Sequence, residues 1–355
     1  MSTARALLLI GALAPGYLAA QPRPAPTPSP SPAPAPATST SQFAPKEFEV
    51  PFGARTRPRD PFADTHGRVW FVGQNGNYVA YLDAKSGEFT RYEIDPGTNP
   101  HNLVVEKGMV WFTGNRNSRL VKLDPATGKL TTYMIPDSSV RDPHTLTFDP
   151  KSGIAWFTAQ NAGAVGRFDP ATAQFRIWKA GANTRPYGIV LDSRGRPWFD
   201  LFGTNKVATI DPRTFELTQT TLPNDRTRPR RLAITTDDQL YYGDYTRGFL
   251  GHLDPRTGRT EEWALPAGLA SLPYAMTTDD RDIIWIAQNG RANVPATLVA
   301  FDPHARKFVA EIPVGKPGPN TIRHMTFDRA TRQIWFGTDQ GTIGKISVPP
   351  MALVP

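Results

Sequence analysis

The chain has 355 residues, 36 Pro, no Cys and a formal net charge of +8 at pH 7. Without Cys, a disulfide framework, a thiolate metal centre and a cysteine nucleophile are all excluded. The basic charge suits nucleic acid, an anionic surface or an anionic small molecule, and the location of the protein decides among these. No run of about 20 apolar residues follows the N-terminal segment, so we expect no membrane span there.

Residues 1–20 have the layout of a secretory signal peptide. Arg5 supplies a positive start, residues Ala6–Ala20 are mostly apolar, and small residues precede Gln21. A short membrane anchor is the alternative, but Pro15 and Gly16 interrupt an already short apolar run. We therefore expect an exported protein, periplasmic or secreted, and this location argues against nucleic acid as a partner.

Residues 21–45 are predicted to form a Pro-rich spacer. From Pro22 to Pro36 every second residue is Pro, with mostly Ala, Ser and Thr between. Such a sequence favours extended polyproline geometry and cannot bury a core.

An internal repeat occupies the rest of the chain. An aromatic pair, or its equivalent, recurs at intervals of 41 residues (Trp70 to Trp111) to 50 residues (Trp285 to Trp335). The seven pairs are Trp70-Phe71, Trp111-Phe112, Trp156-Phe157, Trp198-Phe199, Tyr241-Tyr242, Trp285-Ile286 and Trp335-Phe336. Thirteen residues after the first member of each of the first five pairs comes an Asp: Asp83, Asp124, Asp169, Asp211 and Asp254.

Each repeat contains four short strand-like runs separated by turn residues. In the third repeat the runs are Thr145–Phe148, Ala155–Thr158, Ala164–Phe168 and Phe175–Lys179. Four strands at a period of about forty residues indicate the blade of a β-propeller. We therefore predict an all-β fold, a seven-bladed propeller over residues 46–348, followed by a C-terminal tail at 349–355.

The ends of the propeller are predicted to meet in one blade. The last repeat ends at about Val348, before its fourth strand, whereas residues Lys46–Pro51 have the alternation of a fourth strand. This N-terminal segment is expected to add as the outer strand of blade seven, which closes the ring and protects its edges.

One aligned position per blade, at the start of the innermost strand, carries a polar or aromatic side chain. These residues are Arg59, His101, His144, Tyr187, Arg230, Tyr274 and Arg323. Polar neighbours precede them (Arg57, Asp142, Arg185, Arg228) and follow them (Asp60, Asn102, Arg231, His324). In a propeller these positions meet around the central channel, where Arg and Tyr would focus a positive field on an anion. The alternative is that they pair with nearby Asp residues and only hold the blades together.

Several of these motifs resemble the streptogramin (virginiamycin B) lyase family. Pro100-His101-Asn102-Leu103 with Trp111-Phe112-Thr113, and Pro143-His144-Thr145-Leu146 with Trp156-Phe157-Thr158, are similar to its repeated Pro-His-Gly-Ile … Trp-Phe-Thr-Glu units. The resemblance covers all seven repeats. It implies a seven-bladed propeller that opens a cyclic depsipeptide by elimination across the ester C–O bond, with a His base and magnesium held partly by the motif's Glu.

The Glu of that motif is not matched in this chain. Its positions are occupied by Gly73, Gly114, Ala159, Leu201, Asp244, Gln288 and Thr338. The family's acting His and Glu lie in the last blade, where this chain has Arg323 and Thr338. His324 could replace the His only if the strand start shifts register, and magnesium is implied by the resemblance alone.

The predicted function is a lyase-type (C–O bond) or related enzyme that acts at the central mouth. Its substrate is expected to be an anionic or ester- or lactone-bearing small molecule. His101 and His144 are the candidate bases, and the candidate ligand-binding residues are Arg59, Tyr187, Arg230, Tyr274, Arg323 and His324. The alternatives are a non-catalytic binder of an anionic glycan or peptide and a protein-interaction platform, since one fold hosts many activities. We expect a monomer.

Overall fold

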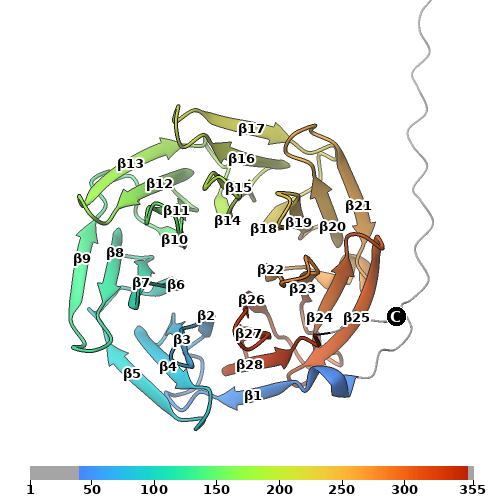
Figure 1. The fold of residues 1–355 in the computed structure, drawn as a ribbon, viewed down its shortest axis with the longest axis horizontal. Helices are drawn as coiled ribbons and strands as arrows, with labels where there is room; N and C mark the ends of the chain where they lie inside the picture. The colour runs from blue at the N-terminus through green and yellow to red at the C-terminus, as the bar shows by residue number, and fades with distance from the viewer. Residues whose placement is uncertain (1–39, 351–355) are drawn as a thin grey trace, which may run out of the picture. The chain divides into compact units, whose positions relative to one another are not determined.

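The computed structural model describes residues 40–350. The predicted signal peptide (1–20), residues 21–39 of the predicted spacer and most of the predicted tail (349–355) lie outside these residues. In the described part, seven four-stranded antiparallel sheets follow one another around a ring (Figure 1). The fold class predicted from the repeats, a seven-bladed β-propeller, is confirmed.

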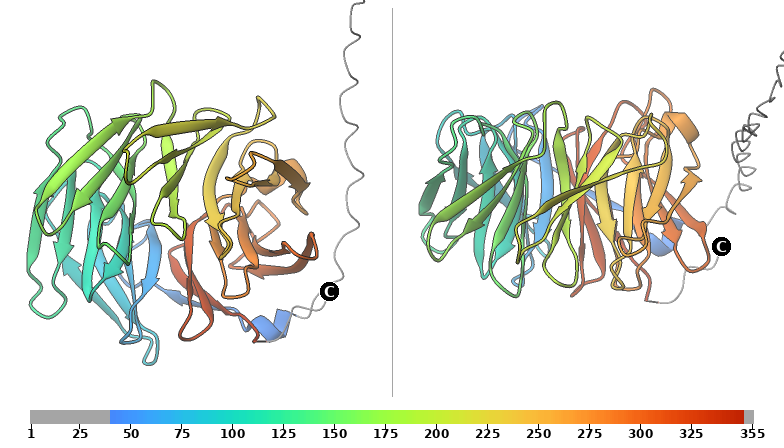
Figure 2. Two further views of the ribbon diagram at one scale, coloured as in Figure 1. Left: turned by 45° about the horizontal axis from the view of Figure 1, so that its top comes forward. Right: turned by 90° about the horizontal axis from the view of Figure 1, so that it is seen from above.

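In each blade the first strand is innermost and the fourth is outermost (Figures 1 and 2). Blades one to three contain β2 (Pro58–Ala63), β3 (Arg68–Gly73), β4 (Tyr78–Asp83), β5 (Phe89–Glu93); β6 (Pro100–Glu106), β7 (Met109–Gly114), β8 (Arg119–Leu123), β9 (Leu130–Met134); and β10 (Pro143–Phe148), β11 (Ala155–Ala159), β12 (Ala164–Asp169), β13 (Gln174–Lys179). Blades four and five contain β14 (Pro186–Leu191), β15 (Pro197–Leu201), β16 (Lys206–Ile210), β17 (Leu217–Thr221); and β18 (Pro229–Ile234), β19 (Leu240–Asp244), β20 (Phe249–Leu253), β21 (Thr260–Ala264). Blades six and seven contain β22 (Met276–Thr278), β23 (Ile284–Gln288), β24 (Ala296–Asp302), β25 (Lys307–Val314); and β26 (Ile322–Asp328), β27 (Gln333–Thr338), β28 (Thr342–Ser347).

The aromatic pairs hold neighbouring blades together. Because successive side chains of a strand point to opposite faces, the two members of a pair pack into different interfaces. Trp111 packs with Leu146 and Phe168 of blade three, whereas Phe112 packs with Trp70 of blade one. The aromatic pair therefore recurs in the sequence because the interface between neighbouring blades recurs around the ring.

Blade seven is completed from the N-terminus, as predicted. Strand β1 (Lys46–Glu49) pairs antiparallel with β28, from Lys46 opposite Lys345 to Glu49 opposite Thr342. A short 3-10 helix, η1 (Thr40–Phe43), precedes it, and a second, η2 (Gly268–Ser271), follows β21. The fully buried ring of Phe43 meets Trp285 edge-on at 5.9 Å, so contacts with the propeller begin ahead of β1.

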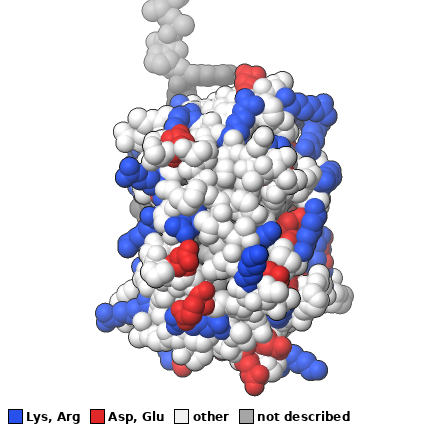
Figure 3. Space-filling view, turned by 90° about the vertical axis from the view of Figure 1, so that its left-hand side faces the viewer, with Lys and Arg blue, Asp and Glu red and all other residues white. Residues whose placement is uncertain are grey.

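The outer wall of the propeller carries mixed charge. On the side formed by the outer strands of blades one to three, Lys and Arg lie among Asp and Glu without separating into a field of one sign (Figure 3). Among residues 40–350, no helix is long and apolar enough to cross a membrane. Large hydrophobic side chains in that range are exposed only at Met134, Leu269 and Val294, and they form no broad apolar face.

Candidate functional site

A β-bulge at the start of the inner strand gives the channel its polar lining. In six of the seven described sheets the register shifts just after the strand begins, as between Pro143 and Leu146 in blade three. A bulge places two residues opposite one and re-aims their side chains. Several of these residues form hydrogen bonds with other blades around the channel, as Asn102 does with Asp60 and Arg231 with Thr145.

These residues form two rings, which we call the mouth ring and the lower ring. The mouth ring consists of Arg59, His101, His144, Tyr187, Arg230, Tyr274 and Arg323. The lower ring consists of the residues that follow them: Asp60, Asn102, Thr145, Gly188, Arg231, Ala275 and His324. The structure brings the predicted mouth residues together, but it places His324 one level below them.

The mouth ring is closed by its own side chains. The rings of His101 and His144 lie 3.5 Å apart between centroids, and His144 lies 4.0 Å from Tyr187. The hydroxyl of Tyr187 is hydrogen-bonded to that of Tyr274 across the channel. All four side chains are buried. They therefore fill the channel, and a ligand from this side would rest on the ring rather than pass through it.

Arg230 is the mouth-ring cation that faces aromatic rings instead of a carboxylate. Its guanidinium carbon lies 4.0 Å from the ring of Tyr274, 4.2 Å from Tyr245, 4.7 Å from Phe202 and 5.2 Å from Tyr187. Its Nε has no hydrogen-bond partner among the described residues. Cation–π contacts stabilise the charge without using the Nε–H donor, and the guanidinium also interacts with the hydroxyl of Tyr187.

Phe202 is a site residue that the sequence argument missed. It lies four residues after Trp198, the same offset that separates Asn115 from Trp111 and Tyr245 from Tyr241. Asp200 lies two residues before Phe202 in the same blade. In the structure Asp200 is fully buried, and its Oδ2 accepts the backbone N–H of Gly188 at 2.8 Å. The constant offset of four would have identified Phe202.

The arginines around the channel change the acidity of Tyr274. Burial alone would raise the pKa of its phenol. Four guanidinium groups outweigh burial and lower the pKa to about 7; they belong to Arg230, Arg59, Arg231 and Arg323. For Tyr187, burial and the neighbouring Tyr274 raise the pKa to about 12. Tyr274 therefore ionises first, and once it is a phenolate its oxygen accepts the hydrogen bond from the hydroxyl of Tyr187.

The two histidines are neutral at the mouth. Burial lowers the pKa of His101 well below its usual range, and Arg59 and His144 lower it further. Burial lowers the pKa of His144 in the same way, with Arg231 as the largest charge effect. His101 Nδ1 lies 3.1 Å from the carbonyl oxygen of His144, and His144 Nδ1 lies 2.9 Å from Thr145 Oγ1. Their Nδ1 atoms are thus engaged within the ring.

Two other arginines have carboxylate partners. Arg323 donates to both oxygens of Asp339, at 2.9 and 2.7 Å, and Arg59 Nε donates to Asp60 at 2.8 Å. The alternative reading of the ring, in which arginines pair with nearby Asp residues, therefore holds at these two positions. It does not hold at Arg230.

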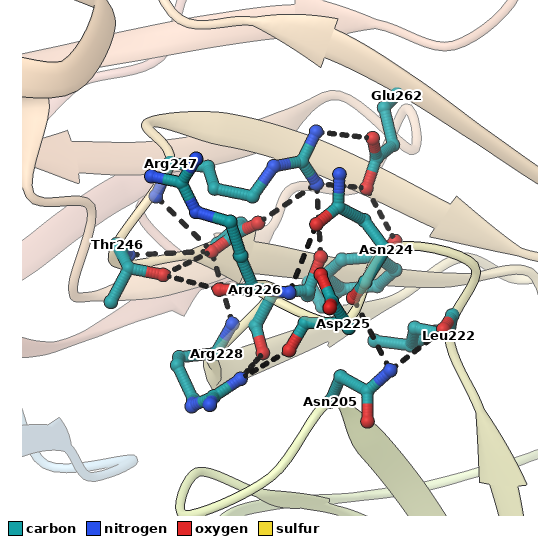
Figure 4. A network of polar contacts seen from close by, with 12 residues as sticks. Asn205, Leu222, Asn224, Asp225, Arg226, Arg228, Thr246, Arg247 and Glu262 are labelled. Atoms are coloured by element: carbon teal, nitrogen blue, oxygen red, sulfur yellow. Dashed lines mark hydrogen bonds and ion pairs between the residues drawn. The ribbon is translucent and has the colours of Figure 1, made fainter. Parts of the chain in front are cut away.

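The residues at the family's metal position do not fit magnesium. Thr338 Oγ1 is hydrogen-bonded to Thr342 Oγ1 at 2.8 Å. The buried carboxylate of Asp244 accepts the backbone N–H of Arg228 and the guanidinium of Arg247, both at 3.1 Å, and Arg247 also pairs with Glu262 (Figure 4). Within residues 40–350 no three acidic or His side chains gather as a metal site would require. Magnesium prefers free carboxylates, and here the nearby cations would repel it.

Solved structures share this fold. A streptogramin B lyase superposes with a TM-score of 0.77 at 23% identity, covering 88% of this chain and 100% of that one. A catalytically inactive virginiamycin B lyase from Staphylococcus aureus with quinupristin gives 0.76 at 22% identity, covering 86% and 100%. The extracellular domain of a hybrid two-component system from B. thetaiotaomicron gives 0.66 at 16% identity, covering 88% of this chain and 44% of that one. At these identities the likeness establishes the fold alone.

No curated protein matches the chain. The match at family level is extensive, because the model of the virginiamycin B lyase family aligns with residues 44–346, which include all seven blades. The chain therefore belongs to the virginiamycin B lyase family.

Proposed function

We propose that the mouth binds a small molecule that carries a carboxylate or an ester, with Arg230 as its principal contact. The observation that supports this is a guanidinium among four aromatic rings with an unpartnered Nε and no ion pair to a described carboxylate. A carboxylate can accept two parallel N–H bonds from such a group. The part-exposed rings of Phe202 and Tyr245 offer flat apolar contact to the rest of the ligand.

Further arginines around the mouth support an anionic ligand. Arg57, Arg185 and Arg228 precede the mouth ring in their blades, and none of the three is fully buried. Asp142 and Asp339 lie among these arginines, and Arg57 is 3.9 Å from Asp339, but Arg, with five N–H donors, outnumbers Asp at the channel entrance. An acidic glycan or a lactone with a nearby carboxylate would meet the same chemistry.

Binding can be tested with a panel of carboxylates, acidic sugars and cyclic esters, by calorimetry on the full chain. Replacing Arg230 by Met should weaken binding about ten- to a hundredfold, since a charge-assisted hydrogen bond is lost. Arg176→Met is the matched control, because Arg176 lies 4.0 Å from Phe215 and 5.1 Å from Trp178, outside the mouth. Equal affinities for parent and Arg230→Met would contradict the proposal.

Tyr274 favours a second, catalytic candidate function, elimination across a C–O bond. In this reaction a base takes a proton from the carbon next to the one that bears the oxygen. The electrons of that C–H bond form a C=C bond, and the C–O bond breaks so that its electron pair leaves with the carboxylate. The phenolate of Tyr274 would accept the proton, and the arginines would stabilise the leaving carboxylate. His101 and His144 remain candidates for the same role.

Variants at these positions distinguish the bases. Removing a general base lowers turnover by about 10²–10⁴ and leaves binding nearly intact. We expect this result for Tyr274→Phe with ester substrates, and a small effect for Tyr245→Phe, the control at the same mouth. If His101→Ala or His144→Ala loses turnover and Tyr274→Phe does not, the base is a histidine. If the parent binds the esters and turns over none, the protein is a binder.

We also propose that the protein is exported. The signal-like segment at residues 1–20 and the likeness to an extracellular domain support this location. The mature protein should begin at Gln21, which sequencing its N-terminus would check.

A further inference from the structure

A cavity occupies the channel below the two rings. Its volume is about 330 Å³, and its walls come from the inner strands β2, β14, β18, β22 and β26. The wall side chains are mainly apolar: Phe62, Val190, Ile234, Met276 and Phe327. Arg231 and His324 of the lower ring also line it. A small anion-binding group is thus placed beside an apolar compartment.

This cavity continues toward the face opposite the mouth. A second space of about 210 Å³ shares Phe62, Thr326 and Phe327 with it and is lined by Arg329. Arg329 is exposed and follows the end of β26. Because the inner strands run from the mouth to the opposite face, a ligand would enter from the side that the mouth ring does not close.

Arg231 is a buried cation with free donors. Only 3% of it is exposed, and its Nη1 donates to Thr145 Oγ1 at 3.0 Å from across the channel. Its Nε and Nη2 have no partner among the described residues. A buried charge is normally paired, because its removal from water is unfavourable. The two free donors lie on one edge of the guanidinium, which is the edge that a carboxylate binds with both oxygens.

Neither neighbouring acid, Asp60 or Asp200, forms an ion pair with Arg231, although both lie in its electrostatic field. The carboxylate of Asp60 accepts Arg59 Nε at 2.8 Å and Asn102 Nδ2 at 2.7 Å. Burial raises the pKa of Asp200 well above its usual range, which favours the neutral carboxyl, although the charge of Arg231 acts in the opposite direction. Two other polar atoms of the cavity residues are also unpartnered, His324 Nδ1 and Thr278 Oγ1. A ligand rich in hydrogen-bond acceptors would therefore supply the partners that these polar groups of the cavity lack.

We propose that this cavity is a second binding site, specific for a carboxylate with a short apolar tail. The carboxylate accepts from Nε and Nη2 of Arg231, and the tail lies against Phe62, Met276 and Phe327. The volume lies at the lower end of the range for small-molecule pockets, which are typically about 300–1,000 Å³. This site is independent of the one proposed at the mouth, and the two are approached from opposite faces.

The test uses hexanoate and benzoate, with hexanol and benzamide as uncharged counterparts, in calorimetric titrations of the full chain. The carboxylates should bind and their counterparts should bind about tenfold more weakly or not at all. Arg231→Met should lose about tenfold or more in affinity at this site. In Arg230→Met the cavity should keep the affinity of the parent, whatever that variant does to binding at the mouth. This contrast separates the two sites, because the effect of Arg231→Met on hexanoate binding does not depend on whether the mouth binds a ligand.

A second pair of variants keeps the test valid if Arg231→Met fails to fold. Thr278→Phe fills the cavity without touching the arginine and should abolish binding of hexanoate, whereas Thr278→Val preserves the volume and should bind. Three outcomes would overturn the proposal. The first is no binding of either carboxylate, which would mean that the cavity holds only ordered water, and the second is equal binding by Arg231→Met and the parent. The third is an equal loss in Arg230→Met and Arg231→Met, which would place the ligand at the mouth.

Discussion

At the scale of single residues, the channel surrounds one oxygen atom with positively charged side chains. The phenol oxygen of Tyr274 is hydrogen-bonded to that of Tyr187 and lies in the field of four guanidinium groups. The arrangement stabilises a negative charge at that point whether it belongs to the phenolate or to a bound ligand. Tyr274 is therefore an internal probe of the field that the proposed ligand would meet.

Replacing Tyr274 by Phe should change the pH dependence of stability. The folded protein has a pKa of about 7 at Tyr274, lowered from 10.0, so the unfolded state holds the proton longer. The parent should gain stability over Tyr274→Phe as pH rises from about 7 to 10, by roughly 1.4 kcal/mol per pH unit. Below pH 7 the difference should not change. Urea titrations across this range, with phenolate absorbance as a second readout, would measure it; a pH-independent difference would contradict the lowered pKa.

The sequence identified the residues of the mouth ring but not their contacts. Aligning the repeats placed one residue of each blade at the channel, because blades repeat the same backbone. The partners within the ring follow no period: Tyr187 meets Tyr274, two blades on, and Arg231 meets Thr145, two blades back. Packing across the channel decides which arginine pairs with a carboxylate and which one faces aromatic rings. The order of residues along the chain does not reveal this packing.

At the scale of the strand, glycine and aromatic residues face each other within blades. In blades three, five and seven a Gly of the third strand lies directly opposite the second aromatic of the pair: Phe157 with Gly166, Tyr242 with Gly251, and Phe336 with Gly344. A Cβ atom on Gly251 would lie 2.0 Å from a ring carbon of Tyr242. The ring occupies the space of the missing side chain. The turn residues in the sequence predicted four strands per blade. The pairing of Gly with an aromatic ring and the β-bulges could not be predicted, because they depend on the register between strands.

Gly251→Ala should therefore destabilise the protein by overpacking. We expect a loss of about 1–3 kcal/mol in the free energy of unfolding, measured by urea titration. Tyr242→Leu in the same chain is the control, because removing the ring should make the added methyl group nearly neutral. Equal losses with and without the ring would show that the contact is not the cause.

At the scale of the whole propeller, one four-residue strand from the N-terminus closes the ring. β1 covers the edge of β28, Phe48 stacks on Trp335 at 6.3 Å, and Glu47 accepts a hydrogen bond from Thr342 at 2.6 Å. Without β1, an open strand edge would face solvent and invite association. The closing strand was predictable because the last repeat lacks exactly what the N-terminus supplies.

A chain that begins at Phe52 should show a much lower melting temperature than the parent and should associate in solution. A chain that begins at Thr40 keeps η1 and β1 and should melt like the parent. Thermal denaturation with light scattering measures both properties, and equal melting temperatures for the two chains would refute the role of β1.

The pairing of β1 with β28 also sets an order of events during synthesis. β1 leaves the ribosome before any other strand of the propeller, and its partner leaves last. Blades one to six can each assemble from consecutive segments, whereas the seventh must wait for the complete chain. Joining the most distant segments is the slowest kind of contact to form. The propeller is thus held open, and unable to close around its channel, until its final strand has been made.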